Sequence, residues 1–272
     1  MLDENLWLKI VKFTPTSSYP KLPCPYCGSQ NLQIKSDDFQ FKELSLKAID
    51  SYLDRFDNTS KPNFYNDDHA ILKIIGAFAW GFDRITHSLY QCAGFFQCSI
   101  CNEHVSAIGV IKRHNERQVS DQIKIETFNP PVPVFPLQNT TPNTINEELL
   151  GSFSYFHSDA CSSGNKLRRA IERLCKELGY GKSLHRNLQD MEKDYPQEAK
   201  WLNSLKLLGN EATHSDNIDE KDLLMGYKVL EVVLDIFRRK IIDPQIENAV
   251  NQLNQKFNKP QLLENKSKAS YL

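Results

Sequence analysis

Hydrophobic and polar residues follow a helical period through most of the second half of the chain. Apolar side chains recur there every three or four residues, which places them on one face of a helix. Segments with this pattern span residues 145–160, 167–178, 184–191, 201–208 and 219–241, followed by a weaker one at 246–257. The first segment ends near the turn-like sequence CSSGN. The pattern predicts a small antiparallel bundle of about four to six helices.

The last strong segment has the most regular stripe. Its apolar residues run from Leu223 to Ile241 in alternating steps of four and three residues. This spacing predicts one long helix that starts near Asp219 and presents a seam to the bundle.

The first half of the chain has a mixed pattern. A helical face is predicted over residues 41–56 and a turn-rich loop over 58–66. The apolar pattern over 69–82 fits either a buried helix or a buried strand, of which we favour the helix. Two apolar runs, 90–96 and 104–111, are typical of β-strands. Trp80, His69 and His87 are interpreted as packing residues in this half.

A proline-rich segment separates the two halves. Five prolines lie between Pro130 and Pro142, which excludes a helix or an inner strand. We therefore place a linker at residues 129–143, between an N-terminal domain at 1–128 and a bundle at 144–242. Residues 243–272 form a C-terminal helix and a frayed tail in this division. The predicted fold class is α+β.

Composition and charge exclude several classes of protein. The 272 residues include 40% apolar and 25% charged side chains, a balance typical of a folded globular chain. A net charge of -1 argues against a protein that coats nucleic acid generally, so any such contact needs a local basic patch. The N-terminus does not resemble a signal peptide, and the apolar run 70–82 is too short for a membrane span. We expect a soluble, cytoplasmic protein without a membrane partner.

Four of the seven cysteines form two close pairs, Cys24 with Cys27 and Cys98 with Cys101. The two-residue spacing lets both thiolates of a turn reach one tetrahedral Zn²⁺ ion. Gly28 follows the first pair and permits the positive φ angle that such a turn requires. The pairs predict a structural zinc site in a zinc ribbon of two hairpins, with residues 28–97 inserted as a helical segment.

The cysteines also admit other interpretations. A redox-active pair would normally open a helix after a strand, a context that this sequence lacks. His104 could replace one thiolate as a ligand, and Cys92 could compete with Cys98. A site closed by four cysteines leaves no position for water, so we expect its zinc to stabilise the fold without catalysis.

The sequence LKLLGNEATHSDN holds a candidate chemical site. If a helix continues through it, Lys206, Asn210 and His214 lie on one face at four-residue spacing. Such a row could hold a phosphate or a carboxylate, and His214 could act as an acid or base. Alternatively, Gly209 and Asn210 end the helix, and His214 caps a carbonyl group or pairs with a nearby acid.

The polar face of the segment 167–178 is basic. Its cations are candidate phosphate-binding residues, although charge on a helix is usually only a solvated face. These cations are Lys166, Arg168, Arg169, Arg173 and Lys176, and a second basic stretch spans 237–240.

The helical half resembles the domain of unknown function 4145. The resemblance rests on the helix with Arg169–Glu172, on the motif formed by Gly209, Asn210 and His214, and on the helix from Asp219. That family is similar to the HEPN superfamily of four-helix bundles, which usually dimerise. Many HEPN proteins are metal-independent ribonucleases with an R-x4-6-H motif, and relatives recur in restriction and phage-defence loci.

The chain departs from the ribonuclease motif, because Gly209 occupies the arginine position. Lys206 or Arg169 would have to supply the missing charge. The resemblance thus implies a non-catalytic binding module for nucleic acid, nucleotide or protein in a prokaryotic defence or restriction system. An endoribonuclease using His214 and a purely structural oligomerisation module are the alternatives. The implied partners are RNA or DNA, other defence proteins and a second copy in a homodimer.

Overall fold

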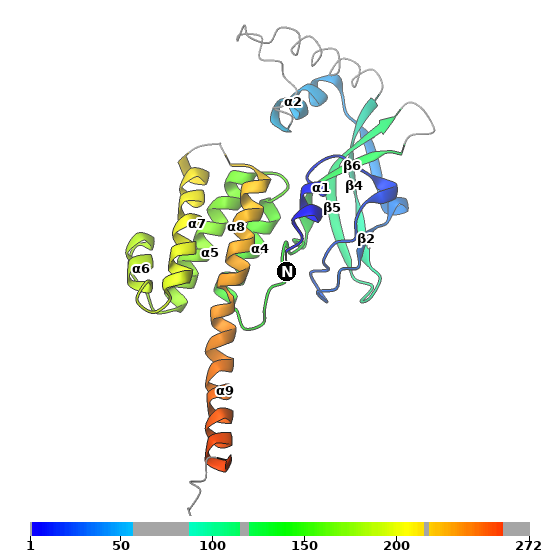
Figure 1. The fold of residues 1–272 in the computed structure, drawn as a ribbon. Helices are drawn as coiled ribbons and strands as arrows, with labels where there is room; N and C mark the ends of the chain where they lie inside the picture. The colour runs from blue at the N-terminus through cyan, green and yellow to red at the C-terminus, as the bar shows by residue number, and fades with distance from the viewer. Residues whose placement is uncertain (1, 57–86, 115–119, 215–217, 258–272) are drawn as a thin grey trace, which may run out of the picture. The chain divides into compact units, whose positions relative to one another are not determined.

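The computed structural model describes residues 2–56, 87–114, 120–214 and 218–257 of the chain. These residues form an α+β structure with an antiparallel sheet and a set of helices (Figure 1). The predictions for residues 58–66 and 69–82, including His69 and Trp80, lie outside the described part. Met1–Val233 form one compact unit, and Leu234–Leu272 form a second one.

The sheet is built around a long hairpin. Strands β4 and β5 pair from His87 opposite His114 to Gln97 opposite His104. The strand order is β1-β6-β5-β4-β2, and β3 also pairs with β4. The bounds are β1 (Thr14–Pro15), β2 (Leu32–Ile34), β3 (Gln40–Glu43), β4 (His87–Cys98), β5 (His104–His114) and β6 (Gln122–Asn129). Both strand-like runs of the sequence are therefore confirmed as strands.

Side chains along these strands alternate between a buried face and an exposed face of the sheet. Cys92, Phe96 and Cys98 of β4 are buried, while the intervening Ala93 and Phe95 are exposed, as the period of two requires. A β-bulge lies between Ile108 and Gly109. A Cβ atom on Gly109 would lie 2.1 Å from the Lys124 carbonyl oxygen, so this close approach of β5 to β6 requires glycine.

The prediction of a helix over 41–56 is wrong at its start. Phe41 lies in β3 opposite Cys92, and helix α2 (Leu46–Phe56) begins only after it. The open edge of β4 supplies hydrogen-bond partners to this segment, and such tertiary pairing overrides a helical pattern. The Ser45 hydroxyl then accepts a hydrogen bond from the Ala48 N–H, which starts α2.

The remaining elements are mostly helices. Helix α5 is the central one and contacts α4, α6, α7 and α8. Its apolar stripe from Leu167 to Cys175 is buried, as the sequence predicted. The bounds are α1 (Glu4–Ile10), η1 (Thr16–Ser18), η2 (Ser36–Asp38), α4 (Asn143–Tyr155), α5 (Ala160–Glu177), α6 (Leu184–Met191), α7 (Pro196–His214), α8 (Glu220–Val233) and α9 (Asp235–Phe257).

Other predicted helix boundaries are also wrong. The sequence CSSGN is the first turn of α5, because the Asp159 carboxylate accepts the Ser162 N–H and caps the helix there. The helix predicted over 219–241 breaks at Leu234, and α9 then continues through Pro244. The apolar seam accordingly ends at Phe237, and Ile241 is exposed.

The helix predicted over 201–208 is longer at both ends. It begins at Pro196, a favourable first position because proline lacks only an N–H that would be unpaired there. It then continues through Gly209 and Asn210 to His214. The alternative that Gly209 and Asn210 end this helix is therefore wrong.

Aromatic residues join the sheet to the helices within the first unit. The Trp7 indole of α1 donates a hydrogen bond of 2.9 Å to the Val134 carbonyl oxygen and lies edge-on to Phe156. His157 contacts Trp7, Phe156 and Phe128 of β6, with ring centroids 5.0–5.7 Å apart. The segment 130–142 forms no helix or strand and buries Val132, Val134 and Phe135.

Among the described residues, no helix is both long and apolar enough to cross a bilayer.

The buried position of His157 predicts a pH-dependent stability. Burial lowers the pKa of its imidazole to about 3, with Lys124 adding to the effect, and its Nδ1 atom has no hydrogen-bond partner among the described residues. The ring is thus neutral in the fold but takes a proton near pH 6.5 when unfolded. The neutral ring therefore contributes fully to the free energy of unfolding above pH 6.5. This contribution is lost progressively as the pH falls below 6.5, because the unfolded chain then takes up a proton that the folded chain does not.

We expect the free energy of unfolding to fall by about 1 kcal/mol more in the wild type than in His157→Phe between pH 7.5 and 5.5. Phenylalanine suits the aromatic surroundings of His157, and its side chain does not titrate. Urea unfolding of both proteins at the two pH values measures this difference. The titration of all other groups is common to both proteins and cancels. Equal pH dependence in the two proteins would contradict the assignment.

Candidate functional site

The structure brings the four paired cysteines together. The thiol sulfurs of Cys24, Cys27, Cys98 and Cys101 all lie within 4.8 Å of one another. The Sγ atoms of Cys24 and Cys101 are 3.7 Å apart, as are those of Cys27 and Cys98. This arrangement could hold one metal ion between the turn before β2 and the turn that joins β4 to β5.

The two turns have the same backbone geometry. The Gly28 N–H donates to the Cys24 carbonyl oxygen, and the Asn102 N–H donates to the Cys98 carbonyl oxygen, each at 2.9 Å. Gly28 has a φ of 71° and Asn102 a φ of 61°, so the positive φ angle predicted for Gly28 is confirmed. Asparagine tolerates this region better than most residues, and its place four residues after Cys98 is the signal that sequence reasoning missed.

Hydrogen bonds inside the cluster lower the pKa of the Cys27 and Cys98 thiols, whereas burial acts to raise the pKa of the Cys24 and Cys101 thiols. Burial acts to raise the pKa of the Cys98 thiol, but the Ser29 hydroxyl and the N–H groups of Cys101 and Ile100 lower it to about 6. His104 lies outside the cluster, with its ring edge-on to Phe95. Cys92 also lies outside it, and burial raises its pKa to about 12. Neither alternative ligand joins the four sulfurs.

A buried carboxylate anchors part of the basic face of α5. Glu148 of α4 is only 8% exposed, and three cations reach it. The nitrogens of Lys166, Arg169 and Arg173 lie 3.2, 2.8 and 3.7 Å from its carboxylate oxygens. Sequence reasoning missed Glu148, although an acid on the apolar face that also carries Leu149 indicates a buried charge in need of a partner.

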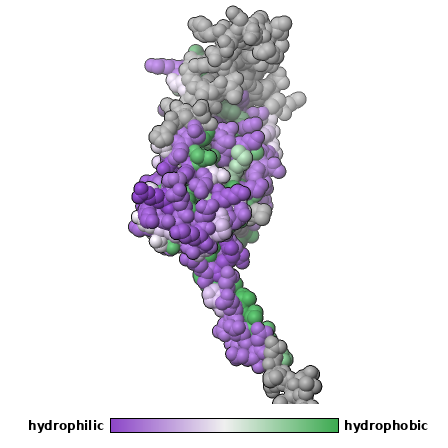
Figure 2. Space-filling model, turned by 60° about the vertical axis from the view of Figure 1, so that its left-hand side comes forward, coloured by the Kyte–Doolittle hydropathy of each residue, from purple (hydrophilic) through white to green (hydrophobic). Residues whose placement is uncertain are grey.

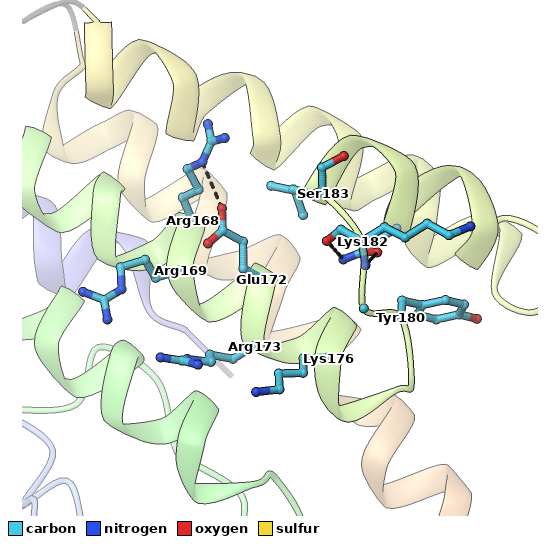
Figure 3. Close-up of a pocket in the computed structure, with 11 residues that line it drawn as sticks. Arg168, Arg169, Glu172, Arg173, Lys176, Tyr180, Lys182 and Ser183 are labelled. Atoms are coloured by element: carbon cyan, nitrogen blue, oxygen red, sulfur yellow. Dashed lines mark hydrogen bonds and ion pairs between the residues drawn. The ribbon is translucent and has the colours of Figure 1, made fainter.

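The same face of α5 borders a pocket of about 580 Å³, here called the basic pocket (Figure 3). Helix α5, the loop that follows it and the start of α6 surround the pocket. Its lining consists of Arg168, Arg169, Glu172, Arg173, Lys176, Tyr180, Gly181, Lys182, Ser183, Leu184 and Asn187. Five of these side chains are cationic and one is acidic, so positive charge dominates the lining.

Backbone contacts hold the loop in place. Gly179 adopts a φ of 95° and ends α5, which requires glycine. The Asn187 side chain accepts the Lys182 N–H at 2.7 Å and donates to the Lys182 carbonyl oxygen at 2.9 Å. The Lys182 ammonium group binds Asp190 at 2.7 Å and lowers the pKa of that carboxyl group. These contacts fix the conformation of the loop, which forms one side of the pocket.

The cations at the pocket point in different directions. In Figure 3 Arg169 and Arg173 extend to one side of α5, while Arg168 extends to another. The Arg168 Nε lies 3.3 Å from Glu172, the contact drawn as a dashed line. Lys176 has no ion-pair partner in the part of the chain that the structure describes. The charged groups thus do not converge on one point.

Gly209 and Asn210 of α7 contact Arg168 of α5. A Cβ atom on Gly209 would lie 2.8 Å from the Arg168 Cβ, so glycine lets α7 approach α5 at this position. The Arg168 guanidinium group donates to the Asn210 side-chain oxygen. Asn210 and Arg168, two of the predicted site residues, are therefore neighbours.

The other residues of the predicted row are separate from this contact. The Lys206 ammonium group lies 3.4 Å from the His185 Nδ1 of α6 and 3.4 Å from the Asn203 side-chain oxygen. His214 is the last residue of α7, and its side chain is outside the described part. The backbone keeps Lys206, Asn210 and His214 at helical four-residue spacing.

Replacement of a cluster cysteine should release the metal ion. We expect about one tightly bound ion per chain in reduced wild-type protein, and loss of that ion with a destabilisation of several kcal/mol in Cys27→Ser or Cys101→Ser. Elemental analysis and urea unfolding measure both effects. Cys161→Ser, at the start of α5, is the matched control and should retain the ion. Wild-type protein with far less than one ion per chain would sink this prediction.

The close approach at Gly209 predicts a packing defect in Gly209→Ala. The added methyl group meets the Arg168 side chain, so we expect a destabilisation of about 1–3 kcal/mol in spite of the better helix propensity of alanine. Gly181→Ala is the control, because no atom lies within 4 Å of its Cβ position. Equal stability of the two variants in urea unfolding would show that α7 does not need glycine here.

Comparison with known proteins gives one match. Residues 152–265 match the family model described as Domain of unknown function (DUF4145), a segment that contains Gly209, Asn210 and His214. No curated protein and no solved structure matches the chain. The helical part of this protein is thus similar to a family of unknown function, as its sequence motifs predicted.

Proposed function

We propose that this protein is a non-catalytic, HEPN-like binding module that holds the phosphate backbone of single-stranded RNA or DNA at the basic pocket. The observation that carries the proposal is the excess of cations around this pocket, five against one acid. The whole chain has a net charge of -1, so this excess is local. Local positive charge attracts a polyanion to one face of a nearly neutral protein.

The arrangement of the cations favours a polymer over a single phosphate ion. Arg168, Arg173 and Lys176 line the pocket, and Arg168 extends to a different side of α5 from the other two. A chain of phosphates can meet such separated charges one after another, whereas a compact anion needs donors that converge. Phosphate contacts of this kind position a nucleic acid without reading its sequence.

Anchoring by neighbouring residues prepares two of the cations for binding. Glu148 holds Arg169 from inside, and Asn210 with Glu172 holds Arg168. An arginine held in this way loses less side-chain entropy when it binds a phosphate, and its planar group still offers further N–H donors. Asn210 is then a positioning residue for Arg168 in the proposed site.

The four cysteines are proposed to bind structural Zn²⁺ and to make the β4–β5 hairpin part of a zinc ribbon. Four thiolates within 4.8 Å suit tetrahedral zinc coordination and leave no position for a reacting water. Cys24, Cys27, Cys98 and Cys101 would hold the ion, which when bound supplies cross-linking of the two turns. The proposed setting, a prokaryotic phage-defence or restriction system with further protein partners, rests on the family resemblance alone.

One observation favours a second function, an endoribonuclease. Helix α7 continues unbroken to His214, so His214 follows Asn210 by one helical turn. Asn210 binds Arg168, and this arginine could supply the charge that Gly209 lacks. In such an enzyme His214 would take the proton of the ribose 2′-hydroxyl or give one to the leaving oxygen, and Arg168 would neutralise the phosphate.

Binding of a labelled single-stranded RNA, followed by fluorescence anisotropy at several salt concentrations, tests the proposed function. We expect Arg168→Ala and Lys176→Ala to weaken binding for all sequences alike. Each should also reduce the slope of log K against log salt by about 0.7, the value for one lost phosphate contact. Lys221→Ala, an exposed lysine of α8, is the control and should bind as the wild type does.

The same samples distinguish the second function. RNA that is cut without added metal by the wild type, but not by folded His214→Ala, would replace the binding module with a nuclease. RNA that is neither bound nor cut would leave the structural oligomerisation module. Equal loss of affinity in Lys221→Ala and Arg168→Ala would contradict the assignment of the basic pocket.

A further inference from the structure

Helix α9 carries large apolar side chains in solvent. Ile246 is 57% exposed and Phe257 is 70% exposed, whereas core residues of the first unit are almost fully buried. Figure 2 shows hydrophobic surface along one side of this helix, in contrast with the hydrophilic surface beside it. The exposed apolar residues of α9 are Ile241, Ile242, Ile246, Val250, Leu253 and Phe257.

Most of these residues form one stripe, here called the α9 stripe, which comprises Ile242, Ile246, Val250, Leu253 and Phe257. Successive members are four, four, three and four residues apart, so they lie on one side of the helix. Spacing near 3.5 residues is the pattern with which two helices interlock along a seam. Asn251 and Gln255 lie on the opposite side and are also exposed.

The helix has weak support of its own. Pro244 lies inside it and removes one backbone hydrogen bond, and Asn248, Asn251 and Asn254 are poor helix formers. Most helical stability in proteins comes from packing of an apolar face. Along the α9 stripe that face is exposed, so a partner that covers it would stabilise the helix.

Charge along the helix favours a second copy of the same helix. Between Ile246 and Phe257 only Glu247 and Lys256 are charged, and the remaining polar residues are asparagine and glutamine. Two such helices therefore bring no block of like charge together. A strongly acidic or basic partner would find nothing to complement.

The residues before the stripe favour a parallel pair. In a seven-residue repeat, Ile246 and Leu253 take one core position, and Val250 and Phe257 take the other. Ile242 then flanks the core, and Arg239 and Asp243 occupy the preceding core positions. In a parallel pair in register, Arg239 of each helix lies near Asp243 of the other, which gives two equivalent opposite-charge contacts. In an antiparallel pair centred on the stripe these residues do not meet.

We infer that α9 is a self-association element, and that two copies of this chain pair through their α9 stripes in a parallel arrangement. The contact is isologous, because the same residues serve on both sides. The inference goes beyond the proposed nucleic-acid binding, since it concerns another surface and stands whether or not the basic pocket binds RNA.

Sedimentation equilibrium of the full, reduced chain over a wide concentration range tests the pairing. We expect a reversible dimer for the wild type and a dissociation constant at least about tenfold higher for Leu253→Lys. Gln255→Lys adds the same charge on the opposite side of the helix and should leave the dimer unchanged. A wild type that stays monomeric at every concentration, or a Leu253→Lys variant that dimerises normally, would overturn the inference.

A charge exchange tests the parallel register in the same measurement. Asp243→Arg places four arginines together and should weaken the dimer, and the double variant R239D/D243R should restore it. Circular dichroism checks that each variant keeps its helix content. A dimer that is indifferent to Asp243→Arg, or one that the double variant fails to restore, would rule out this arrangement.

Discussion

One buried carboxylate, that of Glu148, allows several cations to lie close together on helix α5. Glu148 receives Lys166, Arg169 and Arg173 from a helix whose other face fills the core with Leu167, Ala170, Ile171 and Leu174. Without an acid behind them, these cations would repel one another across two helical turns. Glu148 offsets this repulsion from inside and leaves the outer parts of the cations in solvent. The basic pocket, and with it the proposed binding of nucleic acid, follows from this arrangement.

Two other features of the fold lie at a distance from that pocket, and a third one acts on its lining. The thiols of the four cysteines meet between the turn before β2 and the β4–β5 hairpin, and Trp7 and His157 join the sheet to the helices. Gly209 sets the distance between α5 and α7, so that Asn210 can reach Arg168. The motif of Gly209, Asn210 and His214 thus also has a structural role, since Gly209 and Asn210 set the position of Arg168 on α5.

Sequence reasoning succeeded where one local pattern determines the structure. The CxxC spacing identified the cysteines that meet, and the apolar stripes identified the bounds of α6 and the buried face of α5. It failed where tertiary contacts decide. The edge of β4 makes a strand of Phe41, the Asp159 cap starts α5 within a turn-like sequence, and the helix break falls at Leu234 although Pro244 is the stronger local signal. The partners of Arg168 and Arg169 come from α7 and α4, which no spacing along α5 can reveal.

We propose that the basic pocket, and no other surface of the protein, receives the nucleic acid. Photocross-linking of single-stranded RNA that contains 4-thiouridine, with mass spectrometry of the linked peptides, locates the contact directly. We expect cross-links in peptides from the end of α5, the loop around Tyr180 and Lys182, and the start of α6. Cross-links confined to the sheet or to α9, or their absence at saturating RNA, would contradict it.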